Sequence, residues 1–218
     1  MIVDHVGYFI YPDMIELRLI GRISFPLFLL LVGYNWHYQN KMRLWIYAIS
    51  IQLIFYLLYH YDLTPLVIGN ILVAIAITRI LLGWITKQSL SVQIYIFIIS
   101  MILGNTTNNY VDYGTWSVAF GLMGWWMYHY KSVRVLILRS ILLIYYAYML
   151  TDLGFGQNLF ALISIVAVLL LLGSWIYYGN KTMHISPLLD KIIVRLSSHT
   201  LDIYIVSSIL LWLISVLP

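Results

Sequence analysis

Residues 4–35 read DHVGYFIYPDMIELRLIGRISFPLFLLLVGYN. The stretch carries one acid, one imidazole and two guanidinium groups among mostly apolar residues: Asp4, His5, Arg18 and Arg22. Such groups are costly in hydrocarbon, so they are rare there and usually belong to a working site. The stretch therefore predicts a hairpin of two membrane helices that forms a reactive centre, with the remaining helices as its walls.

The composition excludes an ordinary soluble domain. Hydrophobic residues make up 62% of the 218 residues and charged residues only 9%, against about 25% charged in a soluble domain. The sequence predicts an all-α, polytopic integral membrane bundle that forms a single domain over residues 1–218. Cysteine is absent, which excludes disulfides and a cysteine nucleophile. We expect no cleavable signal peptide, because no basic segment precedes the first apolar run.

Apolar runs predict about nine transmembrane helices, the first of them short. A spanning helix needs roughly 20 apolar residues, so residues 1–11 are too short to cross alone. Either this helix starts inside the membrane or the native chain begins further upstream. The other expected spans are 17–36, 43–60, 64–85, 90–104, 114–130, 133–151, 158–179 and 196–217.

Loop charges predict the orientation of these helices. Eight of the twelve basic residues fall in alternate loops: Lys41, Arg43, Lys87, Lys131, Arg134, Lys181, Lys191 and Arg195. This asymmetry places those loops and the amino terminus in the cytoplasm. It also explains the net charge of +4 better than nucleic-acid binding does, so we expect no nucleic-acid partner.

Other side chains have structural interpretations. Arg79 and Arg139 lie inside expected helices, and long side chains can snorkel to water. Five tryptophans near predicted helix ends are typical of an aromatic belt: Trp116, Trp125, Trp126, Trp175 and Trp212. No histidines and carboxylates show metal-ligand spacing, so we expect no metal.

His5 is the candidate general base. A lone histidine on an apolar face is often a hydrogen-bonded core residue, but His5 lies roughly 9 Å and Arg22 roughly 8 Å below the same predicted surface. Imidazole also suits proton transfer near neutral pH. Adjacent residues on a helix do not face each other, so Asp4 is expected to pair with Arg18 or Arg22 rather than to orient His5.

The opening stretch resembles the TraX family of membrane acetyltransferases. That family has an Asp-His-Gly-type first helix followed by Leu-Arg-x-x-Gly-Arg-x-x-Phe-Pro, which corresponds here to residues 17–26. Asn70, the segment Ser50-Ile51-Gln52 and the corner Asp112-Tyr113-Gly114 are also similar to family features. The chain departs from the family at Tyr204-Ile205-Val206-Ser207, where the last helix usually carries a histidine.

The resemblance implies transfer of an acetyl group from cytoplasmic acetyl-CoA to a pilin amino terminus or a glycan. His5, with Asp4 and Arg22, would be catalytic. The residues implied in binding the cofactor or the acceptor are Arg18, Asn35, Arg43, Asp112 and Tyr113. Asp112 is equally well explained as a helix N-cap. The resemblance also implies a multi-pass protein of the bacterial inner membrane.

Two alternatives stay open from the residues alone. One is a small transporter or channel whose charged side chains line a path, although no internal repeat typical of transporters is found. The other is a non-catalytic assembly factor that holds other membrane subunits. The sequence leaves open the acceptor, nitrogen or oxygen acetylation, an acetyl-histidine intermediate and the oligomeric state.

Overall fold

The computed structural model describes the greater part of the first 150 residues and isolated positions beyond them. The described residues are 3, 6–7, 10–11, 13–36, 41–60, 70–108, 110–111, 113–130, 132–150, 166, 170, 202, 206–207, 209–210 and 214. Inside the helices, some of these residues have a described backbone only.

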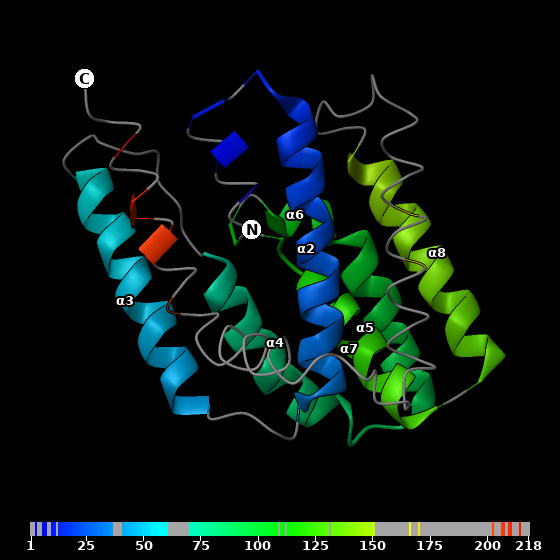
Figure 1. The fold of residues 1–218 in the computed structure, drawn as a ribbon. Helices are drawn as coiled ribbons and strands as arrows, with labels where there is room; N and C mark the ends of the chain where they lie inside the picture. Colours follow the sequence, from blue (N-terminus) through cyan, green and yellow to red (C-terminus); the bar gives the residue numbers. More distant parts are fainter. Residues whose placement is uncertain are drawn as a thin grey trace, which may run out of the picture. The chain divides into compact units, whose positions relative to one another are not determined.

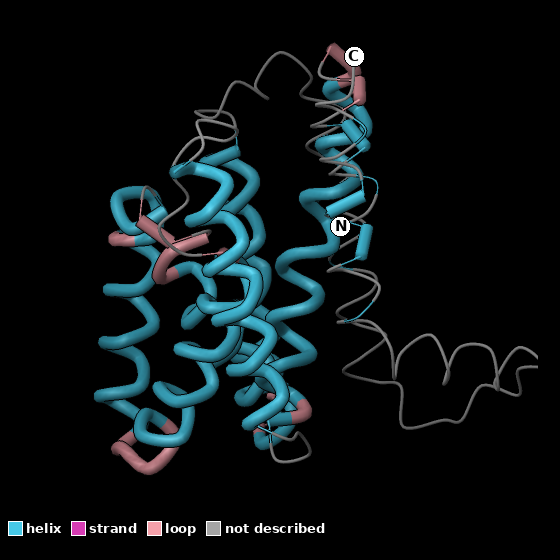
Figure 2. The backbone as a smooth tube through the Cα atoms, turned by 90° about the vertical axis from the view of Figure 1, so that its left-hand side faces the viewer, coloured by secondary structure: helices cyan, strands magenta, loops and turns pink. Residues whose placement is uncertain are grey.

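These residues form helices joined by turns, with no strand among them (Figure 2), which confirms the all-α prediction. The helices are α2 (Ile15–Tyr34), α3 (Lys41–His60), α4 (Ile71–Ile85), α5 (Leu90–Ile102), α6 (Gly104–Asn108), α7 (Trp116–His129) and α8 (Val133–Leu150) (Figure 1). Most ends lie within two residues of the predicted ones. The predicted helix over 64–85 begins at 71 within the described residues, and the predicted helices over 158–179 and 196–217 fall largely outside them.

The prediction of about nine membrane spans is not supported by the described helices. Within the part of the chain that the structure describes, no helix is both long enough and apolar enough to cross a membrane. Helices α4, α5 and α7 have 15, 13 and 14 residues. Turns at Lys87, at Leu103 and at Tyr113 to Thr115 separate them. The short helix α6 was not predicted. Its first residue, Gly104, lies against the indole of Trp116, where any Cβ would collide with the ring.

The chain divides into two compact units. Unit 1 comprises Met1–Phe25 and Tyr146–Pro218, and unit 2 comprises Pro26–Tyr145. The boundary falls inside α2 at Pro26, a residue that lacks the N–H of a regular helical hydrogen bond. The prediction of a single domain stays a prediction.

In unit 1 the described backbone forms a helical turn and then enters α2. The amide of Ile10 donates to the carbonyl of Val6 at 3.0 Å. Within α2 the Ser24 hydroxyl donates to the Gly21 carbonyl at 2.6 Å, and the rings of Phe25 and Tyr146 lie 6.1 Å apart.

In unit 2, hydrogen bonds and packing contacts give the relative directions of the helices. The start of α4 bonds the middle of α3, through Asn70 and Ala48, whereas the end of α4 packs beside the start of α3, so the two are antiparallel. Helix α7 runs parallel to α4, since Thr78 bonds Ser117 and Leu82 packs near Gly121.

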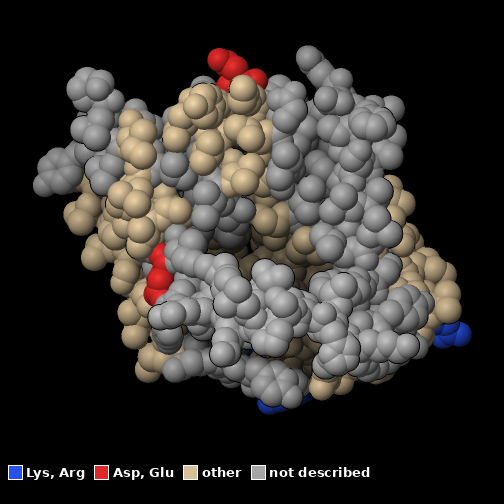
Figure 3. Space-filling view, in the orientation of Figure 1, with Lys and Arg blue, Asp and Glu red and all other residues tan. Residues whose placement is uncertain are grey.

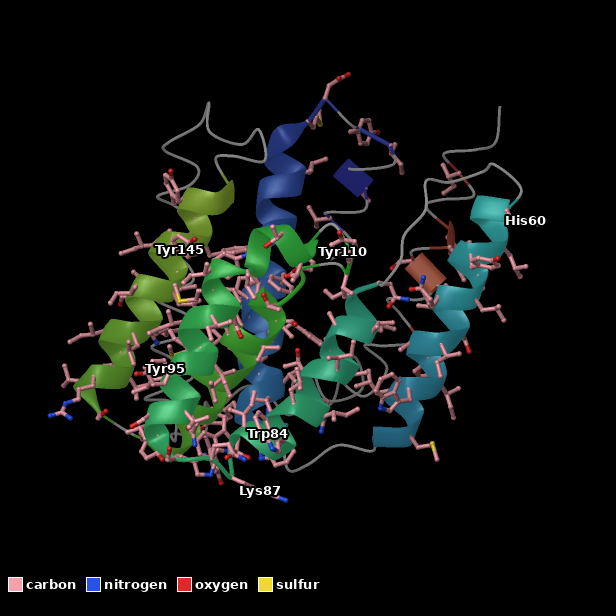
Figure 4. The ribbon with its side chains drawn as sticks, turned by 180° about the vertical axis from the view of Figure 1, so that it is seen from behind. His60, Trp84, Lys87, Tyr95, Tyr110 and Tyr145 are labelled. Atoms are coloured by element: carbon pink, nitrogen blue, oxygen red, sulfur yellow. The ribbon has the colours of Figure 1, made fainter. Side chains whose placement is uncertain are left out.

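Helices α5 and α8 run opposite to α7. The start of α7 meets the end of α5, where the Thr115 hydroxyl donates to the Ser100 carbonyl at 2.9 Å. Trp116 packs on Tyr145, late in α8, with ring centroids 5.3 Å apart. The turns after α4 and α7 therefore lie at one end of unit 2. The α5–α7 connection lies at the other end, as the labels of Lys87 and Tyr110 show in Figure 4.

Helix α7 is the centre of unit 2, and every residue from Trp116 to Met127 is buried. Trp126 donates through Nε1 to Oε1 of Gln93 at 2.7 Å and packs on Phe97 at 5.2 Å. The aromatic-belt prediction is therefore wrong for Trp116, Trp125 and Trp126, because the helix that carries them is enclosed by its neighbours. Trp175 and Trp212 lie outside the described residues.

Glycines let the end of α2 approach α7 closely. A Cβ on Gly124 would collide with the backbone carbonyl of Leu30, and a Cβ on Gly33 would collide with the carbonyl of Gly121. Small residues allow such backbone contact between helices. A side chain at either position would force the two helices apart.

We predict that Gly124→Ala lowers the free energy of unfolding by about 1–3 kcal/mol, because overpacking a tight helix contact shifts the backbone. Gly83→Ala is the matched control, since its Cβ would lie 3.3 Å from the ring of Trp36. There the helix propensity of alanine, about 1 kcal/mol better than glycine, offsets the contact. Thermal unfolding followed by circular dichroism in detergent measures both variants, and equal stabilities would contradict the close approach.

Asn70 joins α3 to α4 through a buried polar network. Its Oδ1 accepts hydrogen bonds from the amides of Leu72 and Val73 at 2.9 and 3.2 Å, which caps α4. Its Nδ2 donates to Oε1 of Gln52 at 3.2 Å and to the carbonyl of Ala48 at 3.4 Å. Asn70 and Gln52, which resemble the family at two separate places in the sequence, are thus hydrogen-bonded to each other.

We predict that Asn70→Ala is less stable than Asn70→Ser by about 1 kcal/mol, because serine still caps the helix and alanine does not. Both variants lose the bridge to Gln52. The same unfolding measurement separates the two contributions, and equal stability of the Ala and Ser variants would exclude a capping role.

Candidate functional site

The predicted catalytic cluster falls mainly on residues whose side chains the structure does not describe. Asp4, His5 and Asp112 lie outside the described residues. Arg18 and Arg22 occupy α2 with a described backbone only. Residues i and i+4 share a helix face, so these two positions align as predicted. The cluster itself stays a prediction.

Pro26 lies one turn beyond Arg22 on the same helix. Proline has no backbone N–H, so it cannot bond the carbonyl of the residue four positions earlier. In α2 that carbonyl belongs to Arg22. The Arg22 carbonyl, at a predicted catalytic position, therefore lacks the regular helical hydrogen bond from residue 26.

Asn35 and Tyr113, both implied in binding, lie at opposite ends of unit 2. The Asn35 amide donates to the carbonyl of Leu31 at 2.9 Å and ends α2. The neighbouring Tyr34 packs edge to face on Tyr128, near the end of α7, at 5.2 Å. Tyr113 precedes the start of α7, and 14 residues of helix span roughly 20 Å. A single small group cannot contact both residues.

Arg43 belongs to the same end as Asn35. It lies in the first turn of α3, and its side chain is not described. The following residues, Leu44 and Trp45, pack beside the end of α4. The implied cofactor residues Asn35 and Arg43 therefore share one end, whereas Tyr113 belongs to the other.

Hydroxyl groups build the corner that holds Tyr113. The Thr115 amide donates to Oγ1 of Thr107 at 2.8 Å, and the Ser117 hydroxyl donates to the carbonyl of Gly114 at 2.7 Å. Thr78 of α4 bonds Ser117 at 2.9 Å. The N-cap position of α7 is Thr115, three residues after Asp112, so the N-cap interpretation of Asp112 is wrong. Helix α7 starts later than predicted because Tyr113 and Gly114 form the turn before it.

The backbone of Tyr113 is left-handed. Its φ is 64° and that of Gly114 is 43°. A bulky residue with positive φ is an outlier, and such strain persists only where the surroundings impose it, often at functional sites. The bonded corner therefore fixes the direction in which Tyr113 leaves the backbone.

Arg79 is a buried cation that the sequence interpretation misjudged. It is 3% exposed, and its Nη2 donates to the carbonyl of Trp36 at 3.0 Å. The prediction that Arg79 snorkels to water is wrong, because the side chain is buried and donates to the Trp36 carbonyl instead. Arg139 of α8 is also 3% exposed. A cation inside an apolar run was the signal that could have marked Arg79 as a site residue.

A cavity of about 170 Å³ opens beside Arg79. Its lining residues come from α3 and α4 and are Leu44, Trp45, Ala76, Arg79, Ile80 and Gly83. It lies at the end of unit 2 where the exposed residues Lys87 and Arg134 follow α4 and open α8. Exposed basic side chains are the blue atoms in the lower part of Figure 3. This end is therefore positively charged and suits anionic groups.

We predict that Tyr113→Gly is more stable than Tyr113→Ala by about 1 kcal/mol, because only glycine adopts positive φ without steric cost. Both variants lose the ring, so the difference isolates the backbone strain. Thermal unfolding of the two proteins in detergent provides the measurement. An alanine variant as stable as the glycine variant would show that the left-handed turn is not strained.

Comparison with known proteins identifies the family. The family model described as TraX protein matches residues 1–187. An uncharacterized protein, RP591, of Rickettsia prowazekii (strain Madrid E) is 30% identical over 135 residues, which cover 61% of this chain and 53% of that protein. The chain thus spans about half the length of the curated relative that it matches. No solved structure gives a significant match. Because the family match covers most of its length, the chain belongs to the TraX protein family.

Proposed function

We propose that the chain is an integral membrane acetyltransferase. It moves an acetyl group from cytoplasmic acetyl-CoA to an amine or hydroxyl acceptor, a pilin amino terminus or a cell-surface glycan. The observation that carries this proposal is membership of the TraX family, which is linked to F-pilin acetylation. The matched range includes Asp4, His5, Arg18 and Arg22.

Exposed apolar side chains support a location in the bilayer. On α8, Val133, Ile137, Ile141 and Ile144 are each more than half exposed and recur at helical spacing. Exposed residues on α3 follow the same pattern: Met42, Ile46, Ile49, Leu53 and Tyr56. Large exposed apolar surfaces mark contact with lipid or with another protein. We place the protein in the bacterial inner membrane with its amino terminus in the cytoplasm.

The proposed reaction needs one proton acceptor and one stabilised oxyanion. The acceptor nitrogen or oxygen forms a bond to the acetyl carbon, the carbon–sulfur bond breaks, and coenzyme A leaves as a thiolate. His5 takes the proton that the acceptor loses. Arg22 stabilises the charge that develops on the carbonyl oxygen, and Asp4 pairs with an arginine of α2.

The residues at the two ends of unit 2 support the proposal that donor and acceptor enter the protein separately. Asn35 and Arg43 belong to the basic end, where the donor phosphates would bind, and Arg18 would contact the substrates from the predicted cluster. Tyr113 belongs to the corner at the other end and would contact the acceptor, together with Asp112, its neighbour in the sequence. The separation of roughly 20 Å along α7 agrees with substrates that arrive from opposite faces of a membrane.

We predict that His5→Ala lowers acetyl transfer by about 10²–10⁴-fold, the usual contribution of a general base. The assay uses membranes that contain the full chain, radiolabelled acetyl-CoA, and a pilin-like peptide with a free amino terminus or a glycan. His60→Ala, at the exposed end of α3, is the matched control and should transfer at the wild-type rate.

Two results would count against the proposal. Undiminished transfer by His5→Ala would remove His5 from the mechanism. Wild-type membranes that label neither the peptide nor the glycan would argue against the enzyme class. Recovery of labelled histidine after an acid quench distinguishes an acetyl-histidine intermediate from direct transfer.

A further inference from the structure

Helix α5 is buried along one narrow stripe only. Its buried residues are Gln93, Phe97 and Ser100. Gln93 and Phe97 contact Trp126 of α7, and the carbonyl of Ser100 accepts the hydrogen bond from Thr115. Residues three and four apart share a helix face, so these contacts leave the wider face of α5 outside the packing with α7.

The wider face of α5 is apolar. Tyr95, Ile98, Ile99 and Ile102 are exposed, as are Leu90 at the start of the helix and Leu103 just after it. The helix contains no charged residue. Its exposed serine, Ser91, lies in the first turn. We call this face, from Leu90 to Leu103, the apolar band; surfaces of this kind mark contact with lipid or with another protein.

The end of the band that follows α4 is polar and basic. Lys87 and Ser89 are exposed in the turn between α4 and α5, and Trp84 is exposed in the last turn of α4. Tryptophan favours the boundary between lipid and water, and lysine attracts anionic headgroups. This composition matches the headgroup region of a phospholipid bilayer better than it matches the apolar surface of a second protein.

The other end of the band is polar as well. Helix α6 begins at Gly104, and the exposed Thr106 hydroxyl donates to the carbonyl of Leu103 at 3.1 Å. Tyr110, which follows α6, is also exposed. Figure 4 labels Lys87 and Tyr110 at opposite ends of the helices, with Tyr95 between them. The band therefore has a polar boundary at each end, as a surface that crosses hydrocarbon requires.

The band is shorter than an ordinary bilayer is thick. Helix α5 has 13 residues, which span roughly 20 Å, whereas the hydrocarbon core of a bilayer measures about 30 Å. Polar groups drawn into hydrocarbon lose their hydrogen bonds to water. A bilayer accommodates a short hydrophobic surface by becoming thinner around it.

We propose that the apolar band of α5 contacts phospholipid acyl chains and thins the bilayer beside unit 2. The lipids that fit it best are phospholipids with short acyl chains. This inference rests on the location in the bilayer given under the proposed function, but it does not depend on acetyl transfer.

The depth of α5 in a bilayer tests the proposal directly. The chain contains no cysteine, so a nitroxide label can be attached to one introduced at the exposed positions Ser91, Ile98 or Leu103. The full chain is placed in dioleoyl phosphatidylcholine vesicles. Electron paramagnetic resonance then compares collisions of the label with oxygen, which concentrates in hydrocarbon, and with a nickel chelate, which stays in water.

We expect the Ile98→Cys label to lie in the hydrocarbon. The Ser91→Cys and Leu103→Cys labels should both lie at the level of the headgroups, although only roughly 18 Å of helix separates them. Edge labels as deep as the Ile98→Cys label would overturn the thin band and leave the location in the bilayer intact.

Two other results overturn the inference for different reasons. An Ile98→Cys label that collides with the nickel chelate would show that α5 faces water, which also contradicts the location in the bilayer. An Ile98→Cys label that is shielded from oxygen and chelate alike would show that protein, such as a second copy of this chain, covers the band.

Lipid chain length provides a second test, which decides the outcome if a labelled variant fails to fold. Thermal unfolding of the unlabelled protein is followed in dimyristoleoyl, dioleoyl and dierucoyl phosphatidylcholine, whose chains lengthen in that order. Tm should be highest in the first lipid and at least about 4 °C lower in the last, because mismatch costs energy. A Tm that is constant or rises with chain length would overturn the proposal.

A matched pair of variants assigns the effect to α5. Thr106→Leu extends the band by one turn, roughly 5 Å, and should reduce the loss of Tm in the longest lipid by about half. Thr106→Ser keeps the hydroxyl and should show the same loss as the wild type. Equal losses in the two variants would mean that α5 does not set the thickness, which overturns the inference.

Discussion

The backbone contact between α2 and α7 is the constraint on which unit 2 depends. Gly33 and Gly124 carry no side chain, so the two helices approach until carbonyl oxygens occupy the space that a Cβ would need. This approach makes α7 the central helix. Its tryptophans consequently pack inward, and its remaining faces contact α4, α5 and α8.

Because unit 2 is so apolar, each polar group inside it needs a specific partner. Trp126 bonds Gln93, Thr78 bonds Ser117, and Asn70 bonds Gln52. A buried polar group without a partner costs about 1–3 kcal/mol, so these pairs select the register of the helices. Apolar packing alone would tolerate several alternative registers of the helices, whereas each of these hydrogen-bonded pairs forms in one register only.

The polar groups of unit 2 lie in two different environments at its two ends. At one end, hydroxyl bonds hold Tyr113 in a left-handed turn. At the other end, Arg79 is buried beside a small cavity and donates to the Trp36 carbonyl. The two ends differ in chemistry because basic residues follow α4 and open α8, whereas threonines, a serine and a glycine form the corner before α7.

The sequence by itself determined that the described chain is helical, where most helices begin and end, and which family the opening motif indicates. These properties follow from local composition and spacing, which a single chain displays directly. It did not determine the partners of Arg79, the burial of Trp126 or the later start of α7. Those depend on which helix lies opposite each residue, and only the tertiary structure, through the close glycine contact and the paired polar groups, decided that.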